Sequence, residues 1–358
     1  MKILFAIPLK VHKEIAEAEV EAFKKLGDDV EVSIYGNSDR VKGLIPRFLL
    51  ILRNAVNLKI KLIQHKSDIV YLNTAFDRKT LVRDAISIFI LKFFNPKVKI
   101  VLKTHGTIKQ VVYSKSFVEK YVYNNSSLIF VLSSEEMKTF KTTFAGTTKI
   151  RATANAINFT EYIPDANFRS KLKVKDSTVV LLFVGRFLEQ KGILDLIQAC
   201  KIAKEKQLCF KLICLGSGPL FDQATELKNA LDLTNEIEFL GHIEETDTRY
   251  YYANCDITIL PSYREGFPMA VFQSVAAGKA IITTKINACA DYFHEYENCL
   301  WTEIKNPTDL ASKILTLSND KELRDRMKVN NLLLAKRFTS VNIAENLKHE
   351  FKNLLESN

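Results

Sequence analysis

The sequence predicts an α/β protein with two doubly wound domains that face one another across a cleft. Three observations predict this class. The chain has 358 residues, more than one ordinary core of about 100–200 residues needs. Apolar runs of strand length alternate with helical patterns from end to end. The alternation restarts after a polar stretch at residues 158–177, which we interpret as a linker.

The first half contains five apolar runs with the length and composition of strands. They lie at residues 2–9, 30–35, 68–73, 98–103 and 128–133. Between the first two runs, apolar residues recur at helical spacing from Ile15 to Leu26, and Gly27 is typical of a helix end. Strands that alternate with helices form parallel sheets covered on both faces. The first domain is therefore expected at residues 1–165.

A second series of strand-like runs follows the polar stretch. It lies at residues 178–184, 209–215, 237–240, 255–260 and 280–283. Apolar residues at helical spacing from Ile193 to Ala203 predict a helix after the first of these runs. We expect the second domain at residues 166–340. Residues 341–358 are helical in pattern and exceed what one sheet needs, so we expect this segment to pack back on the first domain.

The charge of the chain is unevenly distributed. The net charge is +10, and residues 1–165 hold 26 Lys and Arg against 16 Asp and Glu, whereas the remainder holds 25 of each kind. A basic half attracts anionic partners, which include nucleic acid, an acidic membrane surface and phosphate-bearing substrates. Nucleic acid is disfavoured, because aromatic residues are not interleaved with these charges and no nucleic-acid module is recognisable.

The cysteines and the hydropathy pattern indicate a cytoplasmic protein. All six cysteines lie beyond residue 199 without a Cys-x-x-Cys pair, as expected of reduced thiols. Only the segment Ile3–Leu9 is uncharged before Lys10, so no secretory signal is expected. No apolar run approaches the roughly 18 residues that span a bilayer.

The first motif follows the first strand of the second domain. It reads Gly185-Arg186-Phe187-Leu188-Glu189-Gln190-Lys191-Gly192. A glycine turn, two cations and a helix N-terminus converge here, and such a group can hold a diphosphate. A glycine turn with two solvated surface cations explains the same residues equally well.

Two further motifs follow later strands of the same domain. They read Gly216-Ser217-Gly218-Pro219 and Pro261-Ser262-Tyr263-Arg264-Glu265-Gly266-Phe267-Pro268-Met269-Ala270. The backbone of the glycine pair can approach a ligand closely, although a tight strand-to-helix turn is the simpler interpretation. The Glu265 carboxylate can accept hydrogen bonds from sugar hydroxyls beside free helix N–H groups. Alone, Glu265 is equally an ordinary charge at a helix N-terminus.

The order and spacing of these motifs resemble the retaining nucleotide-sugar glycosyltransferases of family four, the group-one transferases with two Rossmann-like domains in the GT-B arrangement. The resemblance covers the second domain well and the first domain loosely. It implies a UDP- or GDP-linked sugar donor and a glycan or lipid-linked acceptor, as in cell-surface polysaccharide synthesis. It implies no cofactor and no metal ion.

The resemblance also implies roles for individual residues. Glu265 and His105, the latter within Thr104-His105-Gly106, are the expected catalytic residues. The expected donor-binding residues are Gly185, Arg186 and Lys191 at the diphosphate, Gly216, Gly218 and His242 at the nucleoside, the backbone amides of Gly266, Phe267 and Met269 at the sugar, and Gln273 at the ribose.

Two positions depart from the family pattern. Gln273 stands where the family usually has a second glutamate, and an amide bonds a hydroxyl without supplying negative charge. The first loop, residues 7–13, lacks the glycine pair that the family commonly has near the phosphates. Lys10 or Lys13 can substitute there electrostatically.

The expected mechanism retains the anomeric configuration without a metal. Arg186, Lys191 and helix N-termini neutralise the leaving diphosphate. A covalent double displacement needs two carboxylates about 5–5.5 Å apart, and no second carboxylate accompanies Glu265 in its motif. Same-face attack is therefore favoured, with the departing phosphate taking the acceptor's proton.

Residues 40–67 form a basic segment with seven Lys and Arg and no acid. If Pro46 begins a helix, its apolar residues form two neighbouring faces. The expected core face is Leu49, Leu52, Val56, Ile60 and Ile63, which leaves Ile51, Leu58 and Leu62 among the cations. Such a surface suits an anionic membrane, at the inner face of the plasma membrane, whereas a solvated basic face is the alternative.

Two other functions remain open. A non-catalytic partner subunit of another transferase would account for Gln273 and the altered first loop. A nucleotide-sugar epimerase of the same two-domain shape would bind the donor similarly, but it needs acid and base carboxylates for which the sequence offers no matching set.

Overall fold

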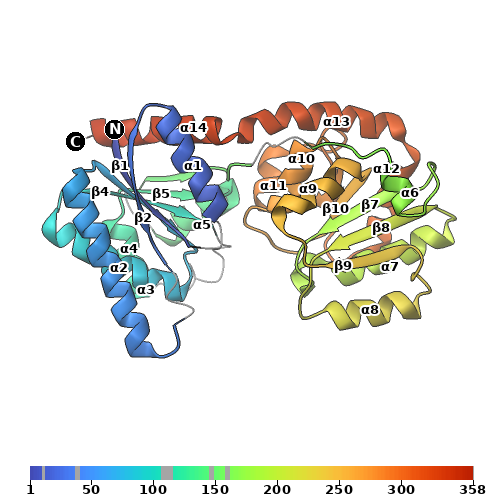
Figure 1. Cartoon of the computed structure of the whole chain (residues 1–358), viewed down its shortest axis with the longest axis horizontal. Coiled ribbons are helices and arrows are strands. Elements are labelled where there is room, and N and C mark those ends of the chain that lie inside the picture. Colours follow the sequence, from blue (N-terminus) through green and yellow to red (C-terminus); the bar gives the residue numbers. More distant parts are fainter. Residues whose placement is uncertain (10–12, 37–40, 106–115, 145–148, 158–161, 358) are drawn as a thin grey trace. The chain divides into compact units, whose positions relative to one another are not determined.

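The computed structural model describes residues 1–9, 13–36, 41–105, 116–144, 149–157 and 162–357. It consists of two compact units (Figure 1). The N-terminal unit comprises Met1–Asn158 and Phe338–Asn358, and the C-terminal unit comprises Phe159–Arg337. Each unit contains one parallel six-stranded sheet with helices on it. The predicted α/β class with two doubly wound domains is confirmed.

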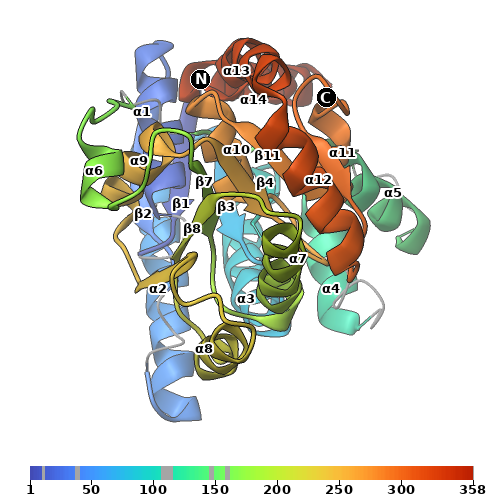
Figure 2. The same ribbon diagram turned by 90° about the vertical axis from the view of Figure 1, so that its right-hand side faces the viewer.

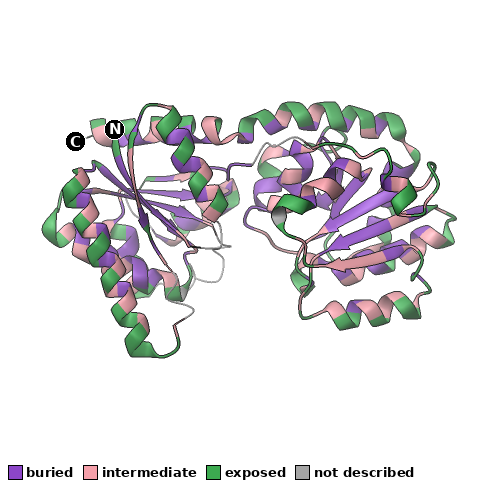
Figure 3. Ribbon diagram, viewed as in Figure 1, coloured by how far each residue is buried: buried purple, intermediate pink, exposed green. Residues whose placement is uncertain are grey.

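The sheet of the N-terminal unit has the order β2-β1-β3-β4-β5-β6. Its strands are β1 (Lys2–Ile7), β2 (Asp29–Ile34), β3 (Ile69–Thr74), β4 (Lys99–Thr104), β5 (Leu128–Val131) and β6 (Lys149–Ala152). All six residues of β3 are buried, as expected for an interior strand with helices over both faces. Figure 3 shows the buried sheet between helices whose outer faces are exposed.

The helices of this unit form two layers. They are α1 (Lys13–Lys25), α2 (Leu44–His65), α3 (Arg78–Phe94), α4 (Phe117–Asn125), α5 (Ser134–Thr143) and α14 (Ser340–Glu356). α2 packs beside α3, and α3 beside α4, whereas α1 packs against α14. Asp77 begins α3 by accepting hydrogen bonds from the N–H groups of Lys79 and Thr80.

α14 brings the far end of the sequence into the core of the N-terminal unit. Phe351 stacks on Phe23 of α1, and it also meets Tyr71 of β3 edge to face, each with 5.6 Å between ring centroids. The Lys348 ammonium lies 2.7 Å from the buried Asp28 carboxylate. The α14 contacts are therefore both apolar and ionic.

The sheet of the C-terminal unit has the order β12-β11-β10-β7-β8-β9. Its strands are β7 (Val179–Val184), β8 (Phe210–Leu215), β9 (Ile237–Gly241), β10 (Ile257–Leu260), β11 (Ala280–Thr284) and β12 (Leu300–Thr302). Its helices are α6 (Phe168–Lys171), the 3₁₀ turn η3 (Glu189–Lys191), α7 (Ile193–Glu205), α8 (Phe221–Ala230), α9 (Glu245–Asn254), α10 (Met269–Ala276), α11 (Asn287–Tyr292), α12 (Pro307–Asn319) and α13 (Lys321–Ala335), and the 3₁₀ turn η4 (Lys336–Phe338) leads to α14. Figure 2 shows α7 beside α12.

Three expectations about local structure were wrong. The stretch at residues 158–177 is not merely a linker, because Phe168 of α6 is buried in the C-terminal unit with Val180 and Leu182. The edge strands β6 and β12 were not predicted. The core face of α2 was assigned to the wrong side, as described below.

Candidate active site

The loops after β7, β8 and β10 meet at one edge of the C-terminal sheet, because parallel strands bring their carboxyl ends together. Backbone hydrogen bonds join these loops. The Phe187 N–H donates to the Ser217 carbonyl at 3.1 Å, and the Tyr263 N–H donates to the Gln190 carbonyl at 2.8 Å. The three sequence motifs therefore form one connected group, which we call the loop cluster (residues 185–192, 216–220 and 261–268).

Glycines allow this close packing of the loops. Gly216 has a φ of +134°, and a Cβ there would stand 2.0 Å from the Gly185 carbonyl oxygen. A Cβ on Gly218 would stand 2.6 Å from the Phe187 carbonyl oxygen, and one on Gly192 would stand 2.3 Å from that of Pro261. Neighbouring backbone thus fills the space that these glycines leave, so the tight-turn interpretation explains Gly216 and Gly218. Their contact with a nucleoside stays a prediction.

Glu265 lies at the centre of the loop cluster. Its Oε1 atom is 2.5 Å from the Lys191 Nζ and accepts a hydrogen bond from the Ser262 hydroxyl at 2.7 Å. The Asn287 amide donates to the Glu265 backbone carbonyl. The side chains of Lys191 and Glu265 are 19% and 12% exposed, so the pair is shielded yet reachable from solvent. The family resemblance implies that Lys191 lies at the diphosphate and Glu265 at the sugar, and the structure brings the two charges together.

The other predicted donor-binding residues differ in exposure and in their contacts. Arg186 is exposed, and within the described part of the chain its side chain makes no hydrogen bond or ion pair. His242 is also exposed and lies 3.6 Å from the Glu244 carboxylate. Gly185 ends the β7 strand region, where its N–H donates to the Leu215 carbonyl. Arg186 is thus a cation available for an anionic ligand.

The start of α10 carries the remaining predicted residues. Gly266 and Phe267 are buried, and Phe267 stacks on Phe272 with 3.8 Å between ring centroids. Met269 is the first residue of α10, and Gln273 lies half-buried one turn further along. The first N–H groups of a helix lack partners within it. The stacking of Phe267 on Phe272 anchors the segment that leads from Glu265 into α10.

Tyr263 and Cys289 lie near Glu265 and are not among the site residues predicted from the sequence. The Tyr263 hydroxyl donates to Asp195 of α7 at 2.7 Å, and Lys305 stands over its ring at 5.0 Å. Burial, and then the hydrogen bond to Asp195, raise the pKa of Tyr263. Burial, and then the Glu265 charge, raise the pKa of the Cys289 thiol. Tyr263 lies in the third motif, and this was the only signal in the sequence that could have pointed to it.

In the N-terminal unit, His105 follows β4 at the carboxyl edge of the sheet. Its backbone N–H donates to the Thr74 carbonyl at 2.9 Å, which extends the pairing of β3 with β4. Its Nε2 atom lies 2.6 Å from the Asn73 Oδ1. Gly106 lies outside the described residues, as does Lys10 of the first loop. Lys13 pairs with Glu17 at 3.3 Å on the surface of α1.

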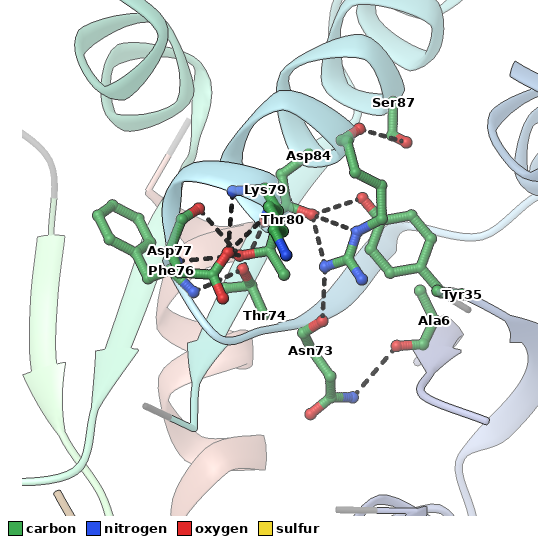
Figure 4. A network of polar contacts seen from close by, with 12 residues as sticks. Ala6, Tyr35, Asn73, Thr74, Phe76, Asp77, Lys79, Thr80, Asp84 and Ser87 are labelled. Carbon is green, nitrogen blue, oxygen red and sulfur yellow. Dashed lines mark hydrogen bonds and ion pairs between the residues drawn. The ribbon is translucent and has the colours of Figure 1, made fainter. Parts of the chain in front are cut away.

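A buried polar network lies beside Asn73 (Figure 4). Asp84 of α3 accepts hydrogen bonds from the Tyr35 hydroxyl at 2.7 Å and from the Thr74 hydroxyl at 2.5 Å. Arg83 contacts Asp84 at 2.8 Å and donates to the Asn73 backbone carbonyl at 3.3 Å. Burial, and then the Asp84 charge, raise the pKa of Tyr35. The network holds the ends of β2 and β3 against α3.

In the N-terminal unit, the outer side of α2 and α3 is apolar and exposed. We call this surface the α2–α3 face. Its exposed residues are Leu44, Ile45, Phe48, Leu49, Val56, Ile60 and Ile63 of α2 and Val82, Phe89, Phe93 and Phe94 of α3. A hollow of about 260 Å³ between the two helices is lined partly by Lys59, Ile63, Lys66 and Phe94.

The α2–α3 face corrects the predicted orientation of α2. The buried residues of α2 are Ile51, Ala55, Leu58 and Leu62, whereas four of the five expected core residues are exposed. Both sets recur at helical spacing, so periodicity alone does not select the buried side. Lys61 lies on the buried side and pairs with Glu31 of β2 at 2.5 Å.

None of the helices described is long and apolar enough to cross a bilayer. No group of three or more His, Cys, Asp and Glu side chains in the described ranges is arranged to hold a metal ion.

Comparison with known proteins shows what the C-terminal unit is similar to. Residues 164–332 match the family model described as glycosyl transferases group 1. The N,N'-diacetylbacillosaminyl-diphospho-undecaprenol alpha-1,3-N-acetylgalactosaminyltransferase of Campylobacter jejuni is 30% identical over 149 residues, which are 42% of this chain and 38% of that protein. The lipopolysaccharide 1,2-N-acetylglucosaminetransferase of Salmonella typhimurium is 22% identical over 357 residues, which cover 95% of this chain and 88% of that protein. The chain spans about two fifths of the length of several curated relatives that it matches.

The solved structures extend the likeness to both units. The crystal structure of Anabaena Alr3699/HepE in complex with UDP matches with a TM-score of 0.74 at 19% identity, and the match covers 99% of this chain and 100% of that one. At this identity the likeness shows the fold. The family match thus lies within the C-terminal unit and covers a little under half of the chain, whereas the likeness in fold, the GT-B fold, extends over both units.

Proposed function

We propose that this protein is a retaining glycosyltransferase that needs no metal ion or cofactor. It moves a sugar from a nucleotide diphosphate donor to a glycan or lipid-linked acceptor in cell-surface polysaccharide synthesis. The observation that carries the proposal is the Lys191–Glu265 pair in the loop cluster, with the exposed Arg186 nearby in sequence. The names of the Campylobacter and Salmonella relatives, both sugar transferases, support it.

The pair provides a way to couple donor binding to the site's chemistry. In the structure, the Lys191 ammonium lies 2.5 Å from the Glu265 carboxylate and neutralises it. A diphosphate competes with the carboxylate for the Lys191 ammonium, and Arg186 can supply a second, bidentate contact. When Lys191 turns to the diphosphate, the Glu265 carboxylate becomes an acceptor for sugar hydroxyls. The two cations then neutralise charge where it grows on the leaving group.

The proposed reaction retains configuration by attack on the face from which the phosphate departs. The bond between the anomeric carbon and the phosphate oxygen breaks, and a bond to the acceptor oxygen forms. The acceptor's proton goes to the leaving phosphate oxygen, so no enzyme base is consumed. The donor is a UDP- or GDP-linked sugar, and the UDP in the Anabaena complex favours testing UDP first.

Donor binding and transfer test the proposal directly. We expect UDP or GDP to raise the melting temperature of the full chain, because a ligand at a hundred times its Kd stabilises by about 2.7 kcal/mol. Arg186→Ala and Lys191→Ala should each weaken nucleotide binding in calorimetric titration and slow transfer. Lys206→Ala, an exposed lysine at the end of α7, is the matched control. Unchanged affinity in both site variants would exclude the donor-site assignment.

The requirement for a metal has its own experiment. Transfer should continue in excess EDTA, because Arg186 and Lys191 provide the charge that a divalent ion otherwise supplies. Activity lost on chelation and restored by magnesium or manganese would contradict a metal-independent reaction.

The α2–α3 face is proposed to hold the protein at the cytoplasmic side of an anionic membrane, where lipid-linked acceptors are found. Its apolar side chains lie among Arg47, Arg53, Lys59 and Lys66. Apolar residues flanked by cations match a headgroup region with anionic lipids. Lys59 stands 3.0 Å from the centroid of the Phe94 ring, so cation and aromatic side chain share one spot on this face.

A second candidate function is a non-catalytic partner subunit, and Gln273 favours it. This residue lies half-buried on α10 where the resembling family has an acid. A partner subunit would bind the nucleotide sugar without hydrolysing or transferring it. An epimerase, the third possibility, would convert the free donor without an acceptor. Product analysis of the isolated protein with donor alone and with donor plus acceptor separates the three.

A further inference from the structure

The side chain of Asn73 bridges three neighbouring strands at the carboxyl edge of the N-terminal sheet. Its Nδ2 donates to the Ala6 carbonyl of β1 at 3.2 Å, and its Oδ1 lies 2.6 Å from His105 Nε2 at the end of β4. Asn73 is 4% exposed, and Arg83 holds its backbone carbonyl at 3.3 Å. Figure 4 shows the amide directed at Ala6.

The orientation of this amide follows from the chemistry of its partners. A backbone carbonyl oxygen only accepts hydrogen bonds, so the amide nitrogen must face Ala6. A reversed amide would place two acceptor oxygens 3.2 Å apart with no proton between them. The amide oxygen therefore faces His105. An amide oxygen also only accepts, so His105 Nε2 must carry a proton.

We infer that Asn73 is a positioning residue that fixes the neutral His105 ring in its Nε2–H tautomer. The value of this tautomer for transfer rests on the proposed function, in which His105 lies near the sugar and the reactive phosphate. A ring free to change tautomer would spend part of its time with its proton on the wrong nitrogen.

The tautomer is measured without any substrate. Long-range proton–nitrogen correlation spectra of the ¹⁵N-labelled full chain distinguish a protonated ring nitrogen from one with a lone pair, and loss of a signal set in His105→Gln assigns it among the six histidines. At a pH above the ring's titration, we expect a protonated Nε2 and a lone pair at Nδ1. A parent protein with Nδ1 protonated instead would overturn the inference.

Two substitutions separate positioning from mere support of the fold. Asn73→Asp keeps an acceptor for Nε2–H, and Asn73→Leu removes it, while both lose the bond to Ala6. We expect the aspartate variant to retain the Nε2–H tautomer and the leucine variant to populate both tautomers. Asn54→Leu is the control, because Asn54 also donates its amide to a backbone carbonyl, that of Gly36 at 3.3 Å. An unchanged tautomer in Asn73→Leu would overturn the inference, and if that variant does not fold, the parent and Asn73→Asp spectra still decide.

The consequence for transfer is a separate measurement. Asn73→Leu should lower kcat by about ten- to a hundredfold while nucleotide affinity stays unchanged, because misplacing one reacting group costs rate rather than binding. Asn73→Asp should keep most of kcat. A parent that transfers no sugar would contradict the proposed function and leave the tautomer result standing. An altered tautomer with unchanged kcat would exclude the positioning role in transfer.

Discussion

Among single residues, Lys191 and Glu265 form the ion pair of the candidate site. Each is the partner of the other at 2.5 Å, and Ser262 adds a hydrogen bond to the same carboxylate oxygen. Removing one member of a partly buried pair destabilises a protein more than removing one member of a surface pair does. Under the proposed function, donor binding rearranges this pair, and substitutions of either residue act on both partners.

Glu265 in the loop before α10 and Gln273 within α10 provide a comparison between two predicted donor contacts. Glu265→Gln should lower turnover roughly ten- to a hundredfold, since hydrogen bonds to a charged group contribute about 1.5–3 kcal/mol. Its nucleotide affinity should be equal or higher, because Lys191 no longer has a competing carboxylate. Gln273→Glu should keep or improve donor affinity with little change in turnover. Steady-state transfer and calorimetric nucleotide binding measure both.

Two outcomes would contradict these expectations. Equal turnover in Glu265→Gln and the parent would remove the catalytic role of Glu265. An inactive parent that becomes active with Gln273→Glu would favour the partner-subunit function.

Gly216 and Gly241 form a second matched pair. Both have positive φ, +134° and +72°, but a Cβ would meet the Gly185 carbonyl only at Gly216, and would meet nothing within 4 Å at Gly241. Gly241→Ala should cost about 1–2 kcal/mol of unfolding free energy from backbone strain alone. Gly216→Ala should cost more than about 3 kcal/mol, because backbone must move. Urea unfolding followed through Trp301, the single tryptophan, reports on the C-terminal unit. Equal costs would mean that the loops do not pack tightly at Gly216.

The sequence identified the residues of the loop cluster but not their contacts. Glycines, cations and a carboxylate after parallel strands have a recognisable chemistry, so Arg186, Lys191 and Glu265 stood out. The Lys191–Glu265 contact joins residues 74 positions apart, and nothing local specifies it. Asn73 went unnoticed for the same reason, since its partners come from two other strands.

Among the elements, interior strands were predictable and edge strands were not. Strands buried on both faces need continuous apolar runs, and β3 or β7 can be recognised from composition alone. β6 and β12 lie at sheet edges, have four and three residues, and include partly exposed positions. α2 shows a different limit, because both of its sides carry apolar residues at helical spacing.

The α2–α3 face predicts binding to membranes through the side of α2 that is exposed. The full chain should sediment with vesicles that contain anionic lipid and should dissociate as salt rises, since each surface cation contributes up to about 1 kcal/mol. Replacing Ile45, Leu49 and Ile63 by Ser should weaken binding by more than tenfold, because burying each CH₂ group contributes about 0.8 kcal/mol.

The controls for this experiment come from the same chain. Val329→Ser with Leu333→Ser removes equally exposed apolar residues of α13 and should leave binding unchanged. Arg53→Glu with Lys66→Glu tests the charges without disturbing Lys61, which is paired with Glu31. Full sedimentation of the triple serine variant would show that this face does not contact lipid.

At the scale of the whole molecule, alternating strands and helices were enough to predict two doubly wound domains. The packing of α14 on the N-terminal unit was expected only because residues 341–358 are helical in pattern and exceed what the second sheet needs. The stacking of Phe351 on Phe23 and the pairing of Lys348 with Asp28 depend on the tertiary fold.

Removing the Phe351 ring should destabilise one unit and spare the other. Phe351→Ala should cost the N-terminal unit about 3–5 kcal/mol, the usual range for a buried aromatic ring. Hydrogen exchange of peptides from α1 and β3 should accelerate, while urea unfolding seen through Trp301 stays as in the parent. Leu333→Ala, an exposed leucine on α13, is the control. Unchanged exchange in α1 would show that α14 does not stabilise this unit.

The placement of α14 also sets an order of events on the ribosome. The N-terminal unit lacks the partner of Phe23 until residue 351 has emerged, which is after the whole of Phe159–Arg337 has been made. At about 5–20 residues per second, synthesis of that intervening stretch takes on the order of ten to forty seconds. The unit that begins first in the sequence is therefore completed last, and during that interval it lacks the Phe351 ring that later packs on Phe23 and Tyr71, which leaves apolar surface for chaperones to bind.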